Sequence, residues 1–170
     1  MKILGLLIRY FTHAHLTCFL RSCGLTLLRS HALTPYLHCM KRSIAQISLV
    51  VNDYDEAIRY YVDVLNFRLV EDKVMSETKR WVVVAPSDQP GCTLLLAKAA
   101  NEEQMSRVGN QTGGRVFLFL HTDDFMRDYN DLVSKGVEFI RGPVKEPYGM
   151  VGVFKDLYGN LWDLIEPAIG

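Results

Sequence analysis

The stretch DLYGNLWDLIEP, residues 156–167, indicates how this chain folds. Its Gly-Asn pair predicts a turn, because both residues adopt positive φ at low steric cost. The residues after the turn alternate between the two faces of a strand, until the proline ends it. Trp162 and Leu164 then belong to the face that packs on a helix, which leaves Asp163 on the other face. A carboxylate in an apolar strand is costly to bury without a partner, so Asp163 is the first candidate for chemistry.

The same order of elements occurs twice along the chain: a strand, an acidic helix cap, an amphipathic helix and three further strands. The first copy predicts strands at residues 44–51, 67–70, 81–85 and 92–97, and a helix that runs from an Asp53–Glu56 capping box to Leu65. The second copy predicts strands at residues 116–122, 137–140, 150–154 and 161–166, and a helix between the Asp123-Asp124 cap and Gly136. The copies align with Asp53 on Asp124 and Val62 on Val133, which predicts an internal duplication.

Three motifs make the chain similar to the vicinal oxygen chelate superfamily, which includes glyoxalase I, extradiol dioxygenases, fosfomycin-resistance proteins and bleomycin-binding proteins. The motifs are ISLVVND at residues 47–53, a tyrosine-bearing helix that ends in LNF at 65–67, and DLYGN at 156–160. This resemblance covers about residues 41–167. It implies an α+β fold in which two βαβββ modules form a curved, cup-shaped mixed sheet around the site. It also implies a homodimer, since many small members pair modules across two chains.

The expected domain organisation separates an N-terminal extension from one folded domain. Residues 40–170 form the domain, with module one at 43–98, a polar linker at 99–114 and module two at 115–167. Residues 1–39 contain no acidic residue and three of the four cysteines. We expect this extension to be disordered, and it is either a leader peptide or the product of a mis-called start. Basic and histidine residues interrupt its apolar runs, so no membrane span is expected.

Charge and cysteine content narrow the function classes. The formal net charge of the chain is zero. The extension contains basic residues and no acidic ones, so the rest of the chain is net acidic. That domain has no basic stripe, and nucleic acid is therefore not an expected partner. Its one cysteine, Cys92, cannot form a disulfide within the domain, which fits a reducing compartment and predicts a cytoplasmic protein.

Strand alternation turns Gln46, His121 and Asp163 away from the helices. The resemblance implies that residues on this side bind a metal, so these three are the predicted ligands. In metal-binding members of the superfamily four ligands occupy such positions, and the alignment puts Gln46, Leu95, Phe117 and Asp163 there. Gln46 and Asp163 offer oxygen donors to a hard divalent ion, whereas a leucine and a phenylalanine offer none. The prediction is therefore an incomplete divalent-metal site. A hydrogen bond to neighbouring backbone accounts equally well for Gln46, and one to the following helix cap for His121.

Four aromatic residues are the predicted substrate-binding residues: Phe117, Phe119, Trp81 and Tyr148. The first three either belong to the core or form a wall on which a flat ligand stacks. Tyr148 lies in a Pro-Tyr-Gly loop, and the resemblance implies that this loop folds over the mouth of the cup, as the equivalent loop does in members of the superfamily.

Two functions remain open from the sequence. The first is a glyoxalase-like lyase or isomerase that acts on a small oxygenated metabolite, with Asp163 as the catalytic base beside a metal-polarised carbonyl. The second is a non-catalytic protein that binds a flat or hydrophobic small molecule, as bleomycin-binding relatives do. Leu95 and Phe117 occupy two of the four ligand positions and cannot bind a metal, so the second function remains open.

Overall fold

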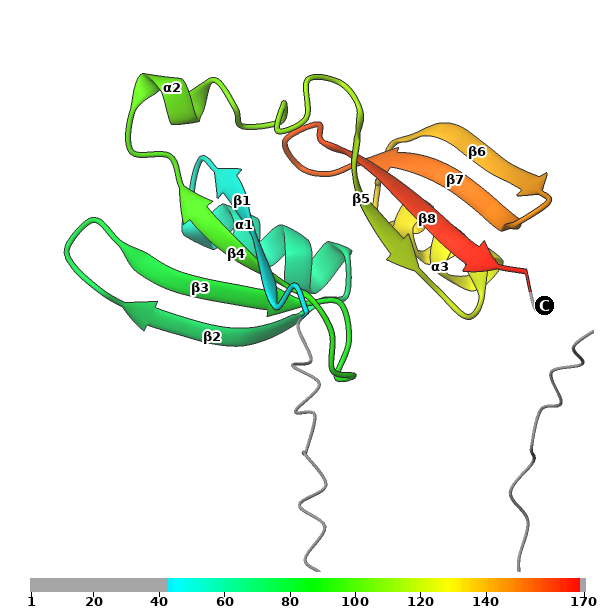
Figure 1. Ribbon diagram of the computed structural model, residues 1–170, viewed down its shortest axis with the longest axis horizontal. Helices are drawn as coiled ribbons and strands as arrows, with labels where there is room; N and C mark the ends of the chain where they lie inside the picture. The colour runs from blue at the N-terminus through cyan, green and yellow to red at the C-terminus, as the bar shows by residue number, and fades with distance from the viewer. Residues whose placement is uncertain (1–42, 169–170) are drawn as a thin grey trace, which may run out of the picture. The chain divides into compact units, whose positions relative to one another are not determined.

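The computed structural model describes residues 43–168, so the predicted N-terminal extension lies outside the described residues. These residues form two mixed sheets of four strands (Figure 1). The strands of module one are β1 (Gln46–Val51), β2 (Arg68–Val74), β3 (Arg80–Ala85) and β4 (Thr93–Lys98). Those of module two are β5 (Val116–His121), β6 (Phe139–Glu146), β7 (Gly149–Lys155) and β8 (Leu161–Pro167).

Both sheets have the same topology. Their strand orders are β1-β4-β3-β2 and β5-β8-β7-β6, and in each sheet the first strand pairs in parallel with the last. The remaining neighbours pair antiparallel. The predicted α+β fold with two βαβββ modules is therefore confirmed. A parallel pair needs a crossover connection, and in each module the helix provides part of it.

The helix of module one begins where the sequence predicts. The Asp53 side chain accepts hydrogen bonds from the backbone N–H groups of Asp55 and Glu56, which caps α1 (Tyr54–Arg59). The helix continues as one π-helical turn, η1 (Tyr60–Val64), and Asn66 follows in the left-handed region with a φ of 58°. Glu56 does not complete a capping box, since its carboxylate accepts a hydrogen bond from the Tyr158 hydroxyl at 3.2 Å.

The helix of module two, α3 (Phe125–Ser134), has two acidic partners at its start. Asp124 accepts a hydrogen bond from the N–H of Arg127, which confirms the predicted cap. Glu166 at the end of β8 accepts a second one from the N–H of Phe125 at 2.8 Å. Two of the first N–H groups of the helix are thus satisfied by carboxylates, which the helix dipole also favours there.

One hydrophobic core joins the two modules. It contains the helix-facing side chains of both sheets, among them Leu49, Leu96, Trp162 and Leu164. Within it a series of aromatic rings in contact runs from η1 through both modules to α3. These rings are Tyr61, Phe67, Trp162, Phe154, Phe139, Tyr129 and Phe125. Each ring buries a large apolar surface, so this series binds the helix of module one firmly to the sheet of module two.

Asp156 lies at the centre of this junction and is buried. Its carboxylate accepts hydrogen bonds from the Tyr61 hydroxyl at 2.8 Å, the Trp162 indole at 3.2 Å and the Asn160 amide at 2.9 Å. It also accepts the backbone N–H groups of Tyr158 and Asn160, which shapes the turn before β8. Burial and the neighbouring Asp156 raise the pKa of Tyr61 well above its usual value, so the phenol remains a donor.

The linker between the modules includes a short helix, α2 (Glu102–Met105), and then runs back along the edge of β1. The amide of Gln111 pairs with both backbone groups of Val50 and so imitates a neighbouring strand there. Gly109 passes the turn before β8 so closely that a Cβ atom would lie 1.9 Å from the Tyr158 carbonyl oxygen. None of the helices found between residues 43 and 168 is long and apolar enough to cross a membrane.

Candidate functional site

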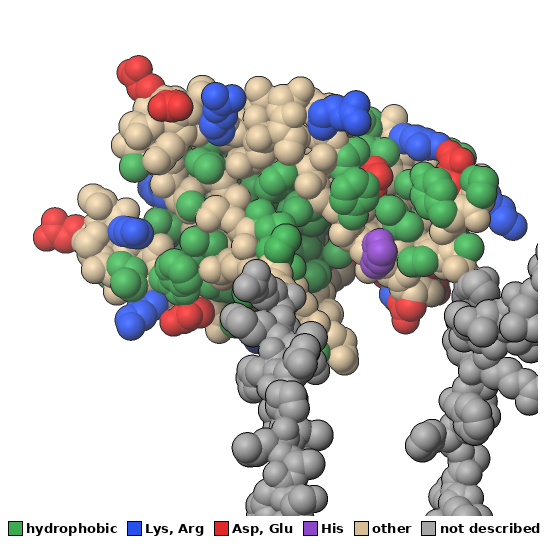
Figure 2. All heavy atoms as spheres, viewed as in Figure 1, with side chains coloured by type: hydrophobic (Ala, Val, Ile, Leu, Met, Phe, Trp, Pro, Cys, Tyr) green, Lys and Arg blue, Asp and Glu red, His purple; other side chains and the backbone are tan. Residues whose placement is uncertain are grey.

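The side of each sheet opposite its helix is the candidate site, and we call it the helix-free face. Figure 1 draws α1 and α3 behind their sheets, so that the helix-free faces point toward the viewer. Figure 2 shows hydrophobic side chains gathered in the middle of this side and charged side chains mainly around its margin. An exposed apolar area rimmed by charge is typical of a surface that binds a ligand or a partner.

In module two the helix-free face carries Phe119, His121 and Asp163. Phe119 pairs with Asp163, and His121 with Ile165, in the parallel register of β5 and β8. Paired residues in neighbouring strands point to the same face, so these three side chains share one surface, as predicted. Phe119 is 62% exposed, which is unusual for a phenylalanine in a strand. Asp163 lies opposite the buried Trp162 and Leu164, and this confirms the predicted alternation in β8.

Asp163 is half-buried and has an altered affinity for protons. Burial raises its pKa above the usual value, and the positive charge of Arg141 opposes this only in part. Arg141 lies on the same face, two strands away through Val153, and forms an ion pair with Glu146 at 2.5 Å. A carboxyl group whose pKa is raised by burial is suited to proton transfer.

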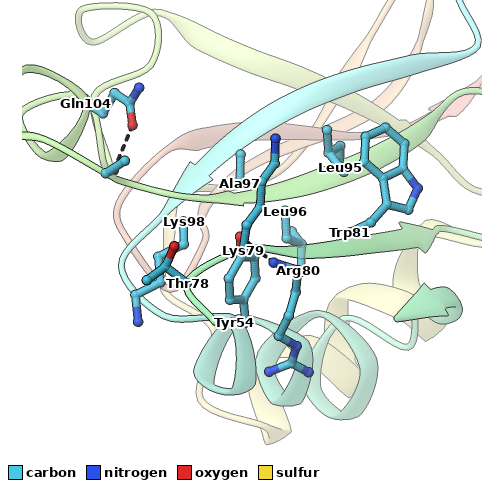
Figure 3. Close-up of a pocket in the computed structure, with 11 residues that line it drawn as sticks. Tyr54, Thr78, Lys79, Arg80, Trp81, Leu95, Leu96, Ala97, Lys98 and Gln104 are labelled. Carbon is cyan, nitrogen blue, oxygen red and sulfur yellow. Dashed lines mark hydrogen bonds between the residues drawn. The ribbon is translucent and has the colours of Figure 1, made fainter. Parts of the chain in front are cut away.

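In module one a pocket of about 370 Å³ opens at the end of the sheet (Figure 3). The pairing of β3 with β4 extends only from Val84↔Leu94 to Val82↔Leu96, and the two strands separate beyond it. The pocket occupies this gap. Its lining is Tyr54, Thr78, Lys79, Arg80, Trp81, Leu95, Leu96, Ala97, Lys98, Ala100 and Gln104.

The residues that line the pocket come from both sides of the sheet. Figure 3 shows Trp81 and Leu95 side by side on the helix-free side, with Lys79 and Ala97 pointing the same way. Arg80 points to the opposite side, toward α1, and Tyr54 points from α1 toward the start of β3. The hydroxyl of Tyr54 accepts the Arg80 N–H at 3.3 Å, and the Arg80 guanidinium lies 5.3 Å from the Tyr54 ring centre. Trp81, predicted as a substrate-binding residue, thus lines a real pocket.

The other residues that the sequence analysis singled out lie in three different environments. The β5–β8 register shifts between Val116 and Leu118, and the Phe117 ring packs against the hydrophobic core. The strict alternation that predicted Phe117 on the helix-free face is therefore interrupted at this residue. Tyr148 is exposed in the two-residue turn between β6 and β7. Leu95, aligned with Asp163, faces the pocket.

The predicted metal ligands are divided between the two sheets. Gln46 lies on β1 and its amide donates to the Thr93 hydroxyl at 3.1 Å, whereas His121 and Asp163 lie on module two. Within residues 43–168 no three His, Cys, Asp or Glu side chains gather closely enough to hold a metal ion. His121 and Asp163 thus share one sheet, and Gln46 lies on the other.

Two features of the structure were not predicted from the sequence. Asp156 is the buried carboxylate of the stretch 156–167, and its five hydrogen bonds make it structural. Lys79 and Gln104 line the pocket, although only Lys79 carried a signal, because it lies two residues before Trp81 and so on the same strand face. Gln104 is brought to the pocket by α2, whose position the pattern of the linker did not predict.

The chain is similar to known proteins in both sequence and structure. The profile of the Glyoxalase/Bleomycin resistance protein/Dioxygenase superfamily matches residues 43–164. An uncharacterized protein of Shewanella frigidimarina is 59% identical over 128 residues, which are 75% of this chain and 95% of that protein. Protein YurT of Bacillus subtilis is 32% identical over 126 residues, 72% of this chain and 98% of its own length.

Among solved structures, the chain is similar to TnmS3, an antibiotic binding protein from Streptomyces sp. CB03234. The two share 28% sequence identity with a TM-score of 0.62, over 77% of this chain and all of TnmS3. It is also similar to a member of the same superfamily from Sphaerobacter thermophilus, with 25% identity and a TM-score of 0.59 over 75% of this chain and 98% of the other.

Proposed function

Because the chain belongs to the Glyoxalase/Bleomycin resistance protein/Dioxygenase superfamily, we propose that it binds a flat, hydrophobic small molecule on its helix-free faces. The observation that carries this proposal is the pocket beside Trp81 and Leu95, where an indole and an aliphatic wall stand together at a gap in the sheet. Ligand pockets are mostly apolar with a few polar groups, and this lining has that character. The likeness to an antibiotic binding protein supports the same class of function.

The proposal includes a homodimer. Phe119 is exposed on the helix-free face of module two, beside the half-buried Asp163. A second copy of the chain would cover this ring and could bring its own module one, with Trp81, over it. The ligand would then lie between aromatic side chains of two chains, which gives stacking on both sides of a planar molecule.

The second candidate function is a glyoxalase-like lyase in which Asp163 moves a proton between neighbouring carbons. The raised pKa of Asp163 supports it, because burial makes this carboxylate a stronger base than an ordinary aspartate. Gln46, His121 and Asp163 would be the ligands of a divalent metal if a dimer brought them together. The metal would polarise the carbonyl of a small oxygenated metabolite.

Titration with the neutral fluorophore N-phenyl-1-naphthylamine tests the binding function. We expect saturable binding by the full chain, and Trp81→Ala weakens it about tenfold, since a buried aromatic contact contributes about 1–1.5 kcal/mol. Met126→Ala is the control, because Met126 is an exposed hydrophobic residue on α3, away from the helix-free faces. Equal affinities of the wild type and Trp81→Ala would contradict the proposal.

Metal analysis of protein purified without chelator separates the two functions. The binding function predicts substoichiometric divalent metal and no change in Asp163→Ala. The lyase predicts one metal per site, lost in Asp163→Ala with the N-phenyl-1-naphthylamine affinity unchanged. Sedimentation of the same samples tests the homodimer.

A further inference from the structure

The pocket beside Trp81 has an uneven charge. Its lining contains three basic side chains, those of Lys79, Arg80 and Lys98, and no Asp or Glu. A surplus of positive charge in a partly enclosed apolar site attracts anions, because the low dielectric of the walls strengthens the interaction. Whether the surplus is available depends on the partners of each cation outside the pocket.

Two of the three cations are neutralised from the helix side. Arg80 forms ion pairs with Asp55, at 2.6 Å, and with Asp72, so its guanidinium is held against α1 and β2. Lys98 forms an ion pair with Asp53, the cap of α1, at 3.2 Å. Both side chains therefore stabilise the junction of the helix with the sheet and contribute little charge to the pocket.

Lys79 differs from both. Within residues 43–168 it has no carboxylate within ion-pair distance. Its backbone is fixed in the β2–β3 hairpin, where its carbonyl accepts the Met75 N–H at 2.8 Å. Figure 3 shows its side chain running past Ala97 on the same side as Trp81 and Leu95. The ammonium is therefore presented to the helix-free side by an anchored segment.

A second donor lies at the rim of the pocket. The carbonyl oxygen of Gln104 accepts the Ala100 N–H at 2.7 Å, which fixes the orientation of the amide. Its amino group then remains as a donor. Lys79 and Gln104 thus offer N–H groups to a ligand, while the wall opposite them consists of Trp81 and Leu95.

We propose that this pocket selects aromatic ligands that carry an anionic group, such as a carboxylate, a sulfonate or a phenolate. The ring packs on Trp81 and Leu95, and the anion pairs with the ammonium of Lys79. Lys79 precedes Trp81 by two residues, about 6–7 Å along an extended chain, which is the width of one or two fused rings. This inference rests on the proposed function and specifies the chemical class of its ligand.

A matched pair of probes tests the class. The anion 8-anilinonaphthalene-1-sulfonate and the neutral N-phenyl-1-naphthylamine share nearly the same rings and differ in the sulfonate. We expect the full chain to bind the sulfonate more tightly, with an affinity that falls as salt is added. Lys79→Gln weakens the sulfonate about fivefold and leaves the neutral probe within about twofold, since a partly exposed ion pair contributes up to about 1 kcal/mol.

Lys73→Gln is the matched control. Lys73 pairs with Trp81 across the β2–β3 ladder, carries the same charge and is exposed, but does not line the pocket. Its replacement should change the sulfonate affinity by less than about twofold. Equal losses in the two variants, or no loss in Lys79→Gln, would overturn the inference.

The outcomes also separate this inference from the proposed function. If the neutral probe binds through Trp81 but the sulfonate binds no tighter, the anionic class is wrong and the binding function stands. If neither probe binds the full chain, both are wrong. Thermal unfolding midpoints of the two lysine variants that match the wild type show that the affinity changes do not arise from misfolding.

Discussion

The turn before β8 and the turn before β4 share the pattern Asp-x-x-Gly, yet their aspartates have opposite environments. Asp156 is 5% exposed and accepts hydrogen bonds from Tyr61, Asn160, Trp162 and two backbone N–H groups. Asp88 has a side chain that is 84% exposed and an ion pair with Arg68 at 2.6 Å. The same local pattern thus yields a structural centre in one module and a surface charge in the other.

The hydrogen-bond donors around each aspartate explain this difference. Tyr61 and Trp162 give Asp156 a phenol and an indole, one from the helix of module one and one from β8. By the internal alignment, Leu132 stands where module one has Tyr61, and Leu94 stands where module two has Trp162. Asp88 therefore has no equivalent donors, and an aspartate without donors stays in water. A duplication reproduces a turn, but burial of its carboxylate requires partners from other elements.

The helix-free faces diverge in a similar way. Leu95 and Asp163 occupy equivalent strand positions, and both face away from the helices. Module one surrounds its position with Trp81 and Lys79, and module two surrounds its own with Phe119 and Arg141. The helix-facing sides of both modules are mainly apolar, because they contribute to one core. The two modules can therefore differ in function mainly through the side chains of their helix-free faces.

Replacing the two aspartates should give the largest contrast. Asp156→Ala leaves the Tyr61 hydroxyl, the Trp162 indole and the Asn160 amide without their acceptor in the core, and we expect a loss of about 3–5 kcal/mol in the free energy of unfolding. Asp88→Ala removes only an exposed ion pair and should cost about 0–1 kcal/mol. Urea unfolding of both variants measures the difference.

Tyr61→Phe is the control for the source of that loss. It removes one donor and keeps the ring, so about 1–2 kcal/mol is expected. A similar small loss for Asp156→Ala would show that the carboxylate does not hold the junction, and that the aromatic series alone does.

The sequence predicted the local elements well, because each carries its own signal. The caps at Asp53 and Asp124, the end of the first helix at Leu65 and the alternation in β8 all depend on residues close together in the chain. The role of Asp156 could not be predicted this way, since its donor Tyr61 comes from the other module. Pairings between distant elements leave no periodic trace in the sequence.

The candidate site was harder to predict for two physical reasons. A register shift in β5 interrupts the alternation at Phe117, and nothing in the local sequence marks it. The pocket at Trp81 exists because β3 and β4 separate beyond Val82 and Leu96, and its rim is completed by Gln104 of the linker. Strand parity gives the face on which a side chain lies, but not where a sheet opens.

The glycines of the two turns give the next contrast. Gly159 has a φ of 97°, which a residue with a Cβ atom adopts only with strain. Gly91 has no positive φ, and a Cβ there would meet its nearest atom, the Gln89 carbonyl oxygen, at 4.0 Å. We expect Gly159→Ala to cost about 1–2 kcal/mol, and Gly91→Ala to be neutral or slightly stabilising. Thermal unfolding measures both, and equal losses would show that the turns are less different than their backbones indicate.

The smallest expected effect concerns Asp163, and its sign depends on pH. Burial raises the pKa of Asp163 in the folded state, so the folded protein binds this proton more readily than the unfolded chain does. Ionisation of Asp163 therefore destabilises the fold above the raised pKa. Asp163→Asn removes this penalty, and we expect a gain of about 0.5 kcal/mol or less at neutral pH, since the group is only half-buried and solvent screens its charge. The gain should disappear as the pH falls through the usual carboxyl range.

Asp72 in module one provides a control of opposite sign. The hydrogen bond and charge of Arg80 lower the pKa of Asp72, so its ionised form stabilises the fold above the ordinary carboxyl pKa. Asp72→Asn should lose up to about 1 kcal/mol at neutral pH, and the loss should shrink as the pH falls through the lowered pKa. Urea unfolding at several pH values would then give curves that shift in opposite directions. If both variants lost stability at neutral pH, Asp163 would have a favourable partner in the folded state, and its candidacy as a proton-transfer group would rest on strand position alone.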